Sequence, residues 1–211
     1  GLSLCALAYQ GYFIKYVPLL LLSLLILIPA YVLWVVVFYY IAGAYAGENP
    51  WGILKNHIPV CKKALKTHSS TATEKYAQEA AAKCSQLKPE FTKETISLFT
   101  QINHCGSVFA EVFFAMIISR ILYGSVPAPG TMVIFCILLA TCSIGAPGLP
   151  WGTVMVSLGT LTGILKFGDS GIALMFAVFA LHDSFATACN MTCNGAIALL
   201  LTGYAKKHGL N

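Results

Sequence analysis

The chain contains little charge. Only 10 % of its 211 residues are Asp, Glu, Lys or Arg, whereas soluble domains carry about 25 %. Hydrophobic residues make up 57 % of the chain. A soluble domain is therefore excluded, and the composition predicts an all-α polytopic membrane protein, since a helix satisfies its own backbone hydrogen bonds in lipid.

Basic residues are scarce outside two regions. Ten of the thirteen lie between Lys55 and Lys93 or at Lys206 and Lys207, and they give most of the net charge of +5. They are not spread over an aromatic-bearing surface, so we expect no nucleic-acid partner. Clusters of lysine mark cytoplasmic segments, so we expect segment 55–93 and the C-terminus in the cytoplasm, in a multi-pass protein of the plasma (inner) membrane.

The sequence lacks a CxxC motif and any zinc-like spacing of ligands. We expect most of the eight cysteines to be small apolar packing residues. A site made from His182, Cys189 and Cys193 is a second interpretation. No nucleophile–base pair and no metal set has convincing spacing, so we do not expect an enzyme. The cysteines are Cys5, Cys61, Cys84, Cys105, Cys136, Cys142, Cys189 and Cys193.

The chain also lacks an initiator Met and a basic stretch before its apolar start, so we expect no signal peptide. Residues 1–14 have the character of the end of a preceding transmembrane helix. We therefore expect a piece of a longer protein, in which residues 15–211 form one transport domain.

A Gly- and Pro-rich stretch, Ser143-Ile144-Gly145-Ala146-Pro147-Gly148-Leu149-Pro150, interrupts the apolar run 131–165. Each apolar arm has about 15 residues, and a helix needs roughly 20 to cross a bilayer. The pattern predicts a re-entrant helical hairpin over 130–166. Its broken tip would free backbone groups that can bind an ion or a solute. A helix–turn–helix connector at the membrane surface is the alternative.

Four further elements are predicted from the distribution of apolar residues. Lysines and a hydroxyl-rich break at Thr67–Thr73 characterise the second of them, which we interpret as another re-entrant hairpin. An amphipathic cytoplasmic hairpin that never enters the membrane is the alternative. In chain order, the elements are a span at 16–46, the first hairpin at 50–90, a span at 95–123 and, after the second hairpin, a span at 171–206.

Polar residues interrupt the span at 95–123. Asn103 and Ser107 bound a short cluster that contains a glycine, which weakens a helix by about 1 kcal/mol. Glu111 follows Ser107 by four residues and His104 by seven, so we expect all three on one helix face. Polar groups within a membrane are costly, so the cluster indicates a partner or a role.

The last span carries a polar stripe. Asp183, Thr187, Asn190 and Asn194 follow one another at steps of four, three and four residues, which places them on one face of a helix. Hydrogen bonding between helices commonly uses one or two small polar residues. Four residues that include a carboxylate exceed that need, so we favour a binding site.

The order of these parts resembles the dicarboxylate/amino acid:cation symporter family, which has the glutamate-transporter-like fold. Segment 143–150 is similar to the family's SIG-x-x-G-[VIL]-P tip, and Asn103–Ser107 aligns with its NMDGT motif. Thr67–Thr71 matches the serine-rich first tip, and Asp183–Asn194 matches the last helix. The resemblance covers nearly the whole chain but only the C-terminal half of the family.

The resemblance implies an elevator-type transport domain in a homotrimer embedded in the lipid bilayer. The two tips would approach each other near the midplane, and the second tip would act as a gate. It implies a secondary active transporter, a symporter of a small polar solute such as an amino acid or organic acid. The solute would contact Ser69, Ser70, Thr71, Ser107, Ala146, Gly148, Leu149, Asp183, Thr187, Asn190 and Asn194.

The chain departs from the family at several functional positions. Cys105 and Ala198 stand where the family has cation-binding aspartates. Asn190 aligns with the arginine that clamps a substrate carboxylate, and Thr187 aligns with the aspartate that binds the amino group. These losses favour the alternative that the protein is a non-transporting relative, a membrane-embedded sensor or interaction subunit.

No bound cofactor is expected, and the candidate coupling ions are Na⁺ and H⁺. Sodium requires oxygen ligands, which two lost carboxylates no longer supply. Intramembrane acids and histidines commonly relay protons, so we expect proton coupling or exchange ahead of strong sodium coupling. The proton-coupling candidates are His104, Glu111 and Asp183. The candidate cation ligands are Asn103, Gly106, Ser143, Ile144, Ala146 and Asn194.

Overall fold

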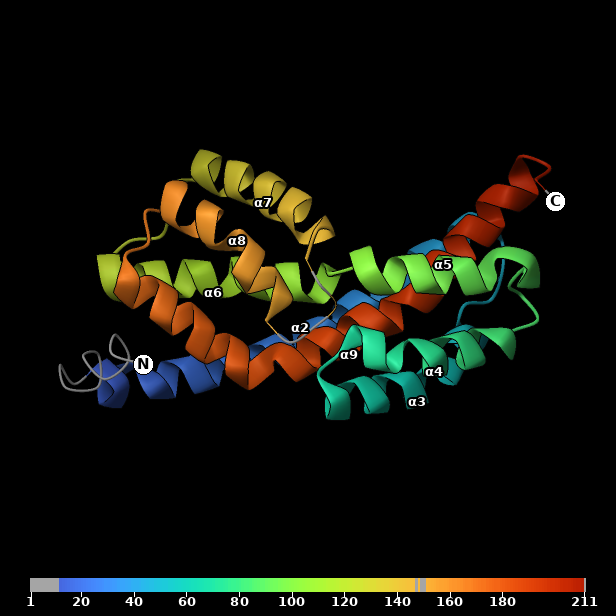
Figure 1. The fold of residues 1–211 in the computed structure, drawn as a ribbon, viewed down its shortest axis with the longest axis horizontal. Coiled ribbons are helices and arrows are strands. Elements are labelled where there is room, and N and C mark those ends of the chain that lie inside the picture. The colour runs from blue at the N-terminus through green and yellow to red at the C-terminus, as the bar shows by residue number, and fades with distance from the viewer. Residues whose placement is uncertain (1–11, 147, 149–150, 211) are drawn as a thin grey trace. The chain divides into compact units, whose positions relative to one another are not determined.

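The computed structural model describes residues 12–146, 148 and 151–210, and this part of the chain is helical without strands. The expectation for residues 1–14 therefore lies almost entirely outside the described part. In chain order (Figure 1), the helices are α2 (Tyr12–Ala46), α3 (Trp51–Thr67), α4 (Ser70–Ala82), α5 (Pro89–Ile102), α6 (Cys105–Tyr123), α7 (Pro129–Ile144), α8 (Gly152–Gly163) and α9 (Asp169–Lys207).

Three helical segments of the described residues are long and apolar enough to cross a membrane: Val17–Ala46, Thr92–Tyr123 and Asp169–Lys207. The second comprises most of α5 together with α6. In α2, large apolar side chains such as Leu25 and Leu33 are about two-thirds exposed, as suits contact with lipid. The predicted all-helical fold is confirmed for the described residues, and the three segments are consistent with a membrane protein.

The chain divides into two compact units. One is drawn from Gly1–Pro29, Ser107–Pro147 and Trp151–Asp183. The other is drawn from Ala30–Gly106, Gly148–Pro150 and Ser184–Asn211. We refer to them as unit 1 and unit 2.

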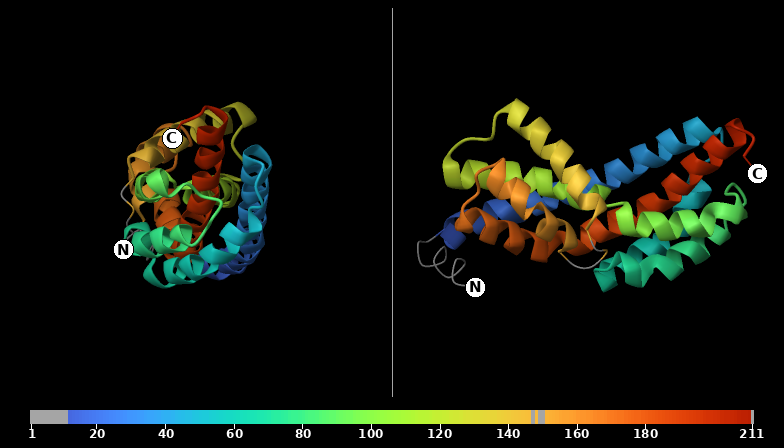
Figure 2. Two further views of the ribbon diagram at one scale, coloured as in Figure 1. Left: turned by 90° about the vertical axis from the view of Figure 1, so that its right-hand side faces the viewer. Right: turned by 45° about the horizontal axis from the view of Figure 1, so that its top comes forward.

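Unit 1 contains the α7–α8 pair, whose two short helices run antiparallel beside each other (Figure 2). Pro129 is the first residue of α7, where a missing N–H costs nothing, and Gly145 ends the helix. Trp151 precedes α8 with a φ of 63°, in the left-handed region. Phe114 of α6, Phe135 of α7 and Leu161 of α8 are fully buried.

Unit 2 contains the α3–α4 hairpin packed against α5 through α4. Ile53, His57, Val60 and Ala64 are buried at steps of four, three and four residues, so they form the packed face of α3. Lys55, Lys62 and Lys66 of the same helix are exposed. The α3 helix is therefore amphipathic, a property shared by both interpretations of the first hairpin.

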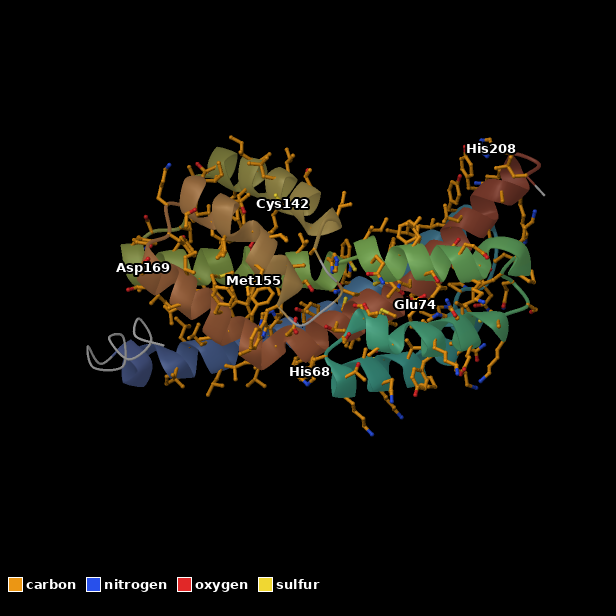
Figure 3. The ribbon with its side chains drawn as sticks, viewed as in Figure 1. His68, Glu74, Cys142, Met155, Asp169 and His208 are labelled. Carbon is orange, nitrogen blue, oxygen red and sulfur yellow. The ribbon has the colours of Figure 1, made fainter. Side chains whose placement is uncertain are left out.

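The break between α3 and α4 is shorter than the hydroxyl-rich segment Thr67–Thr73 indicated. It comprises His68 and Ser69 only. Figure 3 labels His68 at this turn. His68 ends α3 with a φ of 53°, and Ser69 Oγ accepts a hydrogen bond from the N–H of Ala72 at 3.3 Å. Ser69 is thus a helix cap, and hydroxyl residues that follow a cap continue the helix instead of interrupting it.

Candidate functional site

The helical interruption at Asn103 and His104 separates α5 from α6 in unit 2. Asn103 N–H donates to the carbonyl of Phe99 at 2.9 Å and so completes the last turn of α5. The Asn103 side-chain oxygen accepts from the N–H of Cys105 at 3.3 Å, at the start of α6. One asparagine therefore serves both helix ends. The predicted helical stripe through His104, Ser107 and Glu111 does not extend to His104, because His104 lies in the interruption and not in α6.

Asn103 also joins the interruption to α9. Its Nδ2 donates to the backbone carbonyl of Asn190 at 2.9 Å and to Asn194 Oδ1 at 2.8 Å. Asn194 Nδ2 in turn donates to Thr100 Oγ1 of α5 at 3.4 Å. These contacts form an amide network, buried at Asn194 and Thr100 and half-buried at Asn103, between residues that lie about 90 positions apart in the sequence.

Gly106 extends this network to α6. Its N–H donates to Asn190 Oδ1 at 2.7 Å. A Cβ placed on Gly106 would lie 2.8 Å from the carbonyl oxygen of Ala186 and 2.8 Å from Cys189 Cβ. Only glycine therefore lets the first turn of α6 approach α9 this closely.

Asn190 thus has a role that the sequence did not reveal. We predicted it as a solute ligand, but its amide oxygen accepts from Gly106 and its carbonyl accepts from Asn103. The oxygen that would face a solute's donors is already used to position α6. Asn190 is the third residue of the polar stripe, and nothing in the stripe indicates this pairing, because the partner lies 84 residues earlier.

The first tip contacts Gly148, a residue of the second predicted tip that belongs to the same unit. Ser69 Oγ donates to the Gly148 carbonyl at 3.2 Å, and Thr71 donates to it through Oγ1 at 3.4 Å and through its N–H at 3.5 Å. A Cβ on Gly148 would lie 2.9 Å from Thr71 Oγ1. Three donors on the first tip therefore converge on one carbonyl that a side chain at position 148 would displace.

The remaining predicted solute ligands are buried where the structure describes them. Ser70 is buried beside Gly148, and in α9 Thr187 and Asn194 are buried in unit 2. In unit 1, Ser107, Ala146 and Asp183 are buried. Leu149 lies outside the described residues. All four residues of the stripe predicted on α9 are therefore buried.

The second tip in unit 1 offers fewer carbonyls than expected for a cation. The Ser143 carbonyl accepts from the N–H of Ala146 at 3.0 Å, and Ser143 Oγ donates to the carbonyl of Ala140 at 2.8 Å. Ile144 is 58 % exposed at the end of α7. Of the predicted cation ligands, Asn103, Gly106 and Asn194 share one network in unit 2, while Ser143, Ile144 and Ala146 belong to unit 1.

Two titratable groups of the predicted proton path are buried in unit 1. Glu111 in α6 accepts a hydrogen bond from Ser157 Oγ in α8, and its second carboxylate oxygen has no partner among the described residues. Asp183 is buried at the end of the same unit. His182, by contrast, packs its ring between Phe114 and Phe179 and donates from Nδ1 to the carbonyl of Val178 at 2.7 Å.

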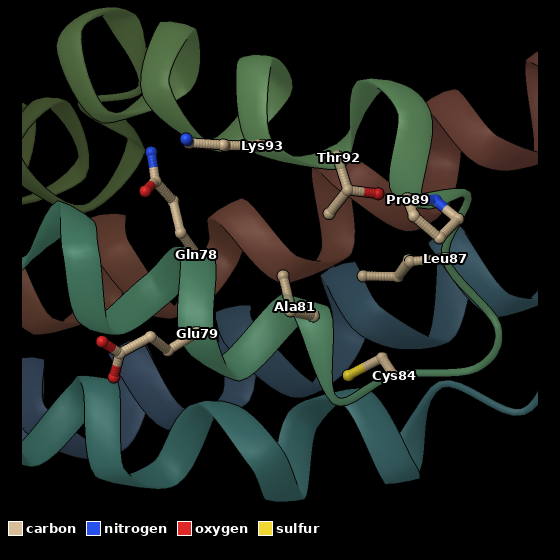
Figure 4. Close-up of a pocket in the computed structure, with 9 residues that line it drawn as sticks. Gln78, Glu79, Ala81, Cys84, Leu87, Pro89, Thr92 and Lys93 are labelled. Carbon is tan, nitrogen blue, oxygen red and sulfur yellow. The ribbon is translucent and has the colours of Figure 1, made fainter.

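A cavity of about 310 Å³ lies elsewhere in unit 2, between the end of α4 and the start of α5 (Figure 4). Glu79, Cys84 and Lys93 are among its lining residues, and none of the predicted site residues lines it. Burial raises the pKa of the Cys84 thiol, which a hydrogen bond from Asn56 partly offsets. The cavity is therefore separate from the amide network and from the tip contact.

Comparison with known proteins gives one family. A family model described as "Sodium:dicarboxylate symporter family" matches residues 3–204. A search of curated proteins gives no match. The family match covers nearly the whole chain, including the interruption between α5 and α6 and both predicted tips.

Proposed function

Because this chain belongs to the sodium:dicarboxylate symporter family, whose members are transporters and not enzymes, we propose that it moves a small polar solute, an amino acid or organic acid, across the plasma (inner) membrane. In this proposal, it works by alternating access as an elevator-type transport domain, within a homotrimer. The α3–α4 and α7–α8 pairs are re-entrant hairpins, and the second is the gate.

The observation that supports this proposal most directly is the contact of Gly148 with the first tip. Ser69 and Thr71 donate to its carbonyl at 3.2 to 3.5 Å, at the long end of the range for hydrogen bonds. Such bonds each contribute only about 1 kcal/mol or less net. A contact of this strength can close over a solute and open again.

The solute in this proposal is neutral or carries a single charge. A second carboxylate on the solute would need a bidentate Arg, whose fork matches its two oxygens. The family's arginine position holds Asn190 here, and its amide carries no charge. The exposed Lys66 and His68, beside the first tip, are the alternative source of positive charge.

The coupling ion is proposed to be H⁺ ahead of Na⁺, although the family name implies sodium coupling. Two carboxylates that would hold sodium are replaced by Cys105 and Ala198. Glu111 retains a buried carboxylate with one oxygen unpartnered among the described residues, so it is the group best placed to exchange a proton.

A second candidate function is a membrane-embedded sensor or interaction subunit that no longer transports. The loss of the two cation-binding acids and of the arginine favours it. In that case, solute binding would persist without net movement of solute.

Uptake into proteoliposomes separates these candidates. The full chain is reconstituted and tested with serine, alanine, aspartate and succinate, with and without Na⁺, at two pH values. We expect accumulation of at least one neutral amino acid, lost in S69A/T71V. The matched control is T141V/T162V, which removes two exposed hydroxyls that bond only within their own helices. Binding without uptake for every solute would instead support the sensor.

A further inference from the structure

Three cysteines from distant parts of the sequence meet in unit 2. The sulfur atoms of Cys105, Cys189 and Cys193 all lie within 4.8 Å of one another. Cys189 and Cys193 are one turn apart on α9, so their side chains share a face. Cys105 is the first residue of α6.

The position of Cys105 is fixed by its neighbours. Gly106 is pressed against α9, with its Cβ position only 2.8 Å from Cys189 Cβ, and its N–H is bonded to Asn190. Asn103, two residues before Cys105, bonds to Asn190 and Asn194. The backbone on both sides of Cys105 is therefore tied to α9, and the third sulfur is held at the pair without a disulfide.

The spacing suits a metal ion. A zinc–sulfur bond is about 2.3 Å, so three sulfurs around one ion lie about 3.8 to 4.0 Å apart. The observed limit of 4.8 Å exceeds this by under about 1 Å, a difference that small side-chain rotations remove. We propose that Cys105, Cys189 and Cys193 form a binding site for a thiophilic divalent cation such as Zn²⁺.

The ligand set determines the class of ion. Thiolates are soft ligands, which favour zinc, cadmium and copper over sodium, magnesium or calcium. Cys189 and Cys193 are 4 % and 0 % exposed, so the net charge left in the site matters. Three thiolates with a divalent ion leave one negative charge, whereas a monovalent ion leaves two, and a buried charge is costly. A divalent ion therefore fits this site better.

The site has a route of entry for an ion. Cys105 is only half-buried, so an ion can reach the cluster from its side. Three protein ligands leave the fourth tetrahedral position of a zinc ion to water.

A bound ion would connect the start of α6 to α9 at the interruption between α5 and α6. This inference goes beyond the proposed transport function and does not depend on it. Metal binding can be measured on protein that is not transporting, so failure of one proposal is distinguishable from failure of the other.

The test is to titrate Cd²⁺ into the reduced, metal-free full chain in detergent. Binding is monitored by the ultraviolet charge-transfer absorption of cadmium thiolates. We expect one tightly bound ion per chain, displaced by Zn²⁺ and unaffected by excess Na⁺. C105S and C189S/C193S should bind more than about 100-fold more weakly, because even partners outside the ligand shell cost about 10- to 100-fold. The matched control C136S/C142S, with both changes in α7, should bind as the unmodified chain does.

Thermal unfolding gives a second readout. Zn²⁺ should raise the Tm of the unmodified chain and of C136S/C142S but not that of C105S, since a ligand stabilises only the state that binds it. Unchanged cadmium affinity in C105S or in C189S/C193S overturns the proposal. It is also overturned if the reduced, unmodified chain binds no Cd²⁺. If mild oxidation then converts two of the three thiols to a disulfide, the cluster is a redox pair.

Discussion

The Oδ1 atom of Asn190 accepts a hydrogen bond from the backbone N–H of Gly106 at 2.7 Å, across 84 residues of sequence. This bond fixes the first turn of α6 to the middle of α9. It makes one asparagine of the polar stripe a structural support.

Gly106→Ala should destabilise the protein by about 1 to 3 kcal/mol, because the new Cβ meets a carbonyl and a side chain at 2.8 Å. Gly159→Ala is the matched control. Gly159 is exposed in α8 with nothing within 4 Å of its Cβ position, so Ala should be neutral or stabilise by up to about 1 kcal/mol. Thermal unfolding in detergent measures both, and equal Tm values for the two variants would contradict the close approach.

Asn103→Asp should destabilise the protein by roughly 2 kcal/mol or more. The change keeps the side chain's size but removes the donor to Asn190 and Asn194, and it places a carboxylate beside two oxygen acceptors. Asn56→Asp is the control, since Asn56 donates only a weak bond to the Cys84 sulfur at 3.3 Å. A Tm loss in N103D no larger than that in N56D would show that the amide network contributes little.

Glu111→Gln should abolish the part of uptake that a pH gradient drives, because the amide cannot exchange a proton. Glu79→Gln, an exposed carboxylate on α4, should leave that part unchanged. Uptake into proteoliposomes is compared with and without an imposed pH gradient. If uptake by the unmodified chain requires Na⁺ and is indifferent to the pH gradient, proton coupling is wrong.

Single cysteines at Ala128 and Gly168 should react with an impermeant thiol reagent from the same side of the membrane, because a re-entrant α7–α8 hairpin returns to the face it entered from. Both positions are exposed, and Gly168 has room for a side chain. Labelling is measured in right-side-out and inside-out vesicles against the unmodified chain. Reaction from opposite faces would mean that the hairpin crosses the membrane.

Serine or alanine should displace a bound neutral ligand at lower concentration than aspartate or succinate does. An unpaired second carboxylate in a low-dielectric site would cost several kcal/mol, on the order of 10³-fold in affinity. Asn190→Arg should shift the preference towards acidic solutes. Since this change also removes the acceptor for Gly106, its folding is checked by gel filtration. Tighter binding of aspartate or succinate by the unmodified chain is enough to refute the assignment.

The helices and their breaks were largely predictable because apolar runs, Gly and Pro act locally. The span at 171–206 corresponds to α9 (Asp169–Lys207), and the arms on either side of Gly145 correspond to α7 and α8. The break near Thr67–Thr73 was predicted too long, because hydroxyl residues both interrupt and cap helices. Ser69 caps α4.

The site was less predictable, because its contacts join distant residues. The sequence allowed a site made from His182, Cys189 and Cys193 as a second interpretation. The third sulfur is instead Cys105, and His182 packs among aromatic rings. No periodicity reports that an interruption between two helices will meet a third helix 84 residues later.

The packing of α9 against α2 in unit 2 affects how mutational data on this protein should be interpreted. A Cβ on Gly203 would lie 2.7 Å from the Ala46 backbone, and one on Gly195 would overlap the hydroxyl of Tyr39. Tyr39 is itself held by a 2.8 Å bond to the Thr192 carbonyl. A screen for lost transport would therefore score positions 195 and 203 as intolerant, although neither is a predicted solute ligand. Cell-surface abundance separates such positions from true ligands, because it falls only where assembly fails.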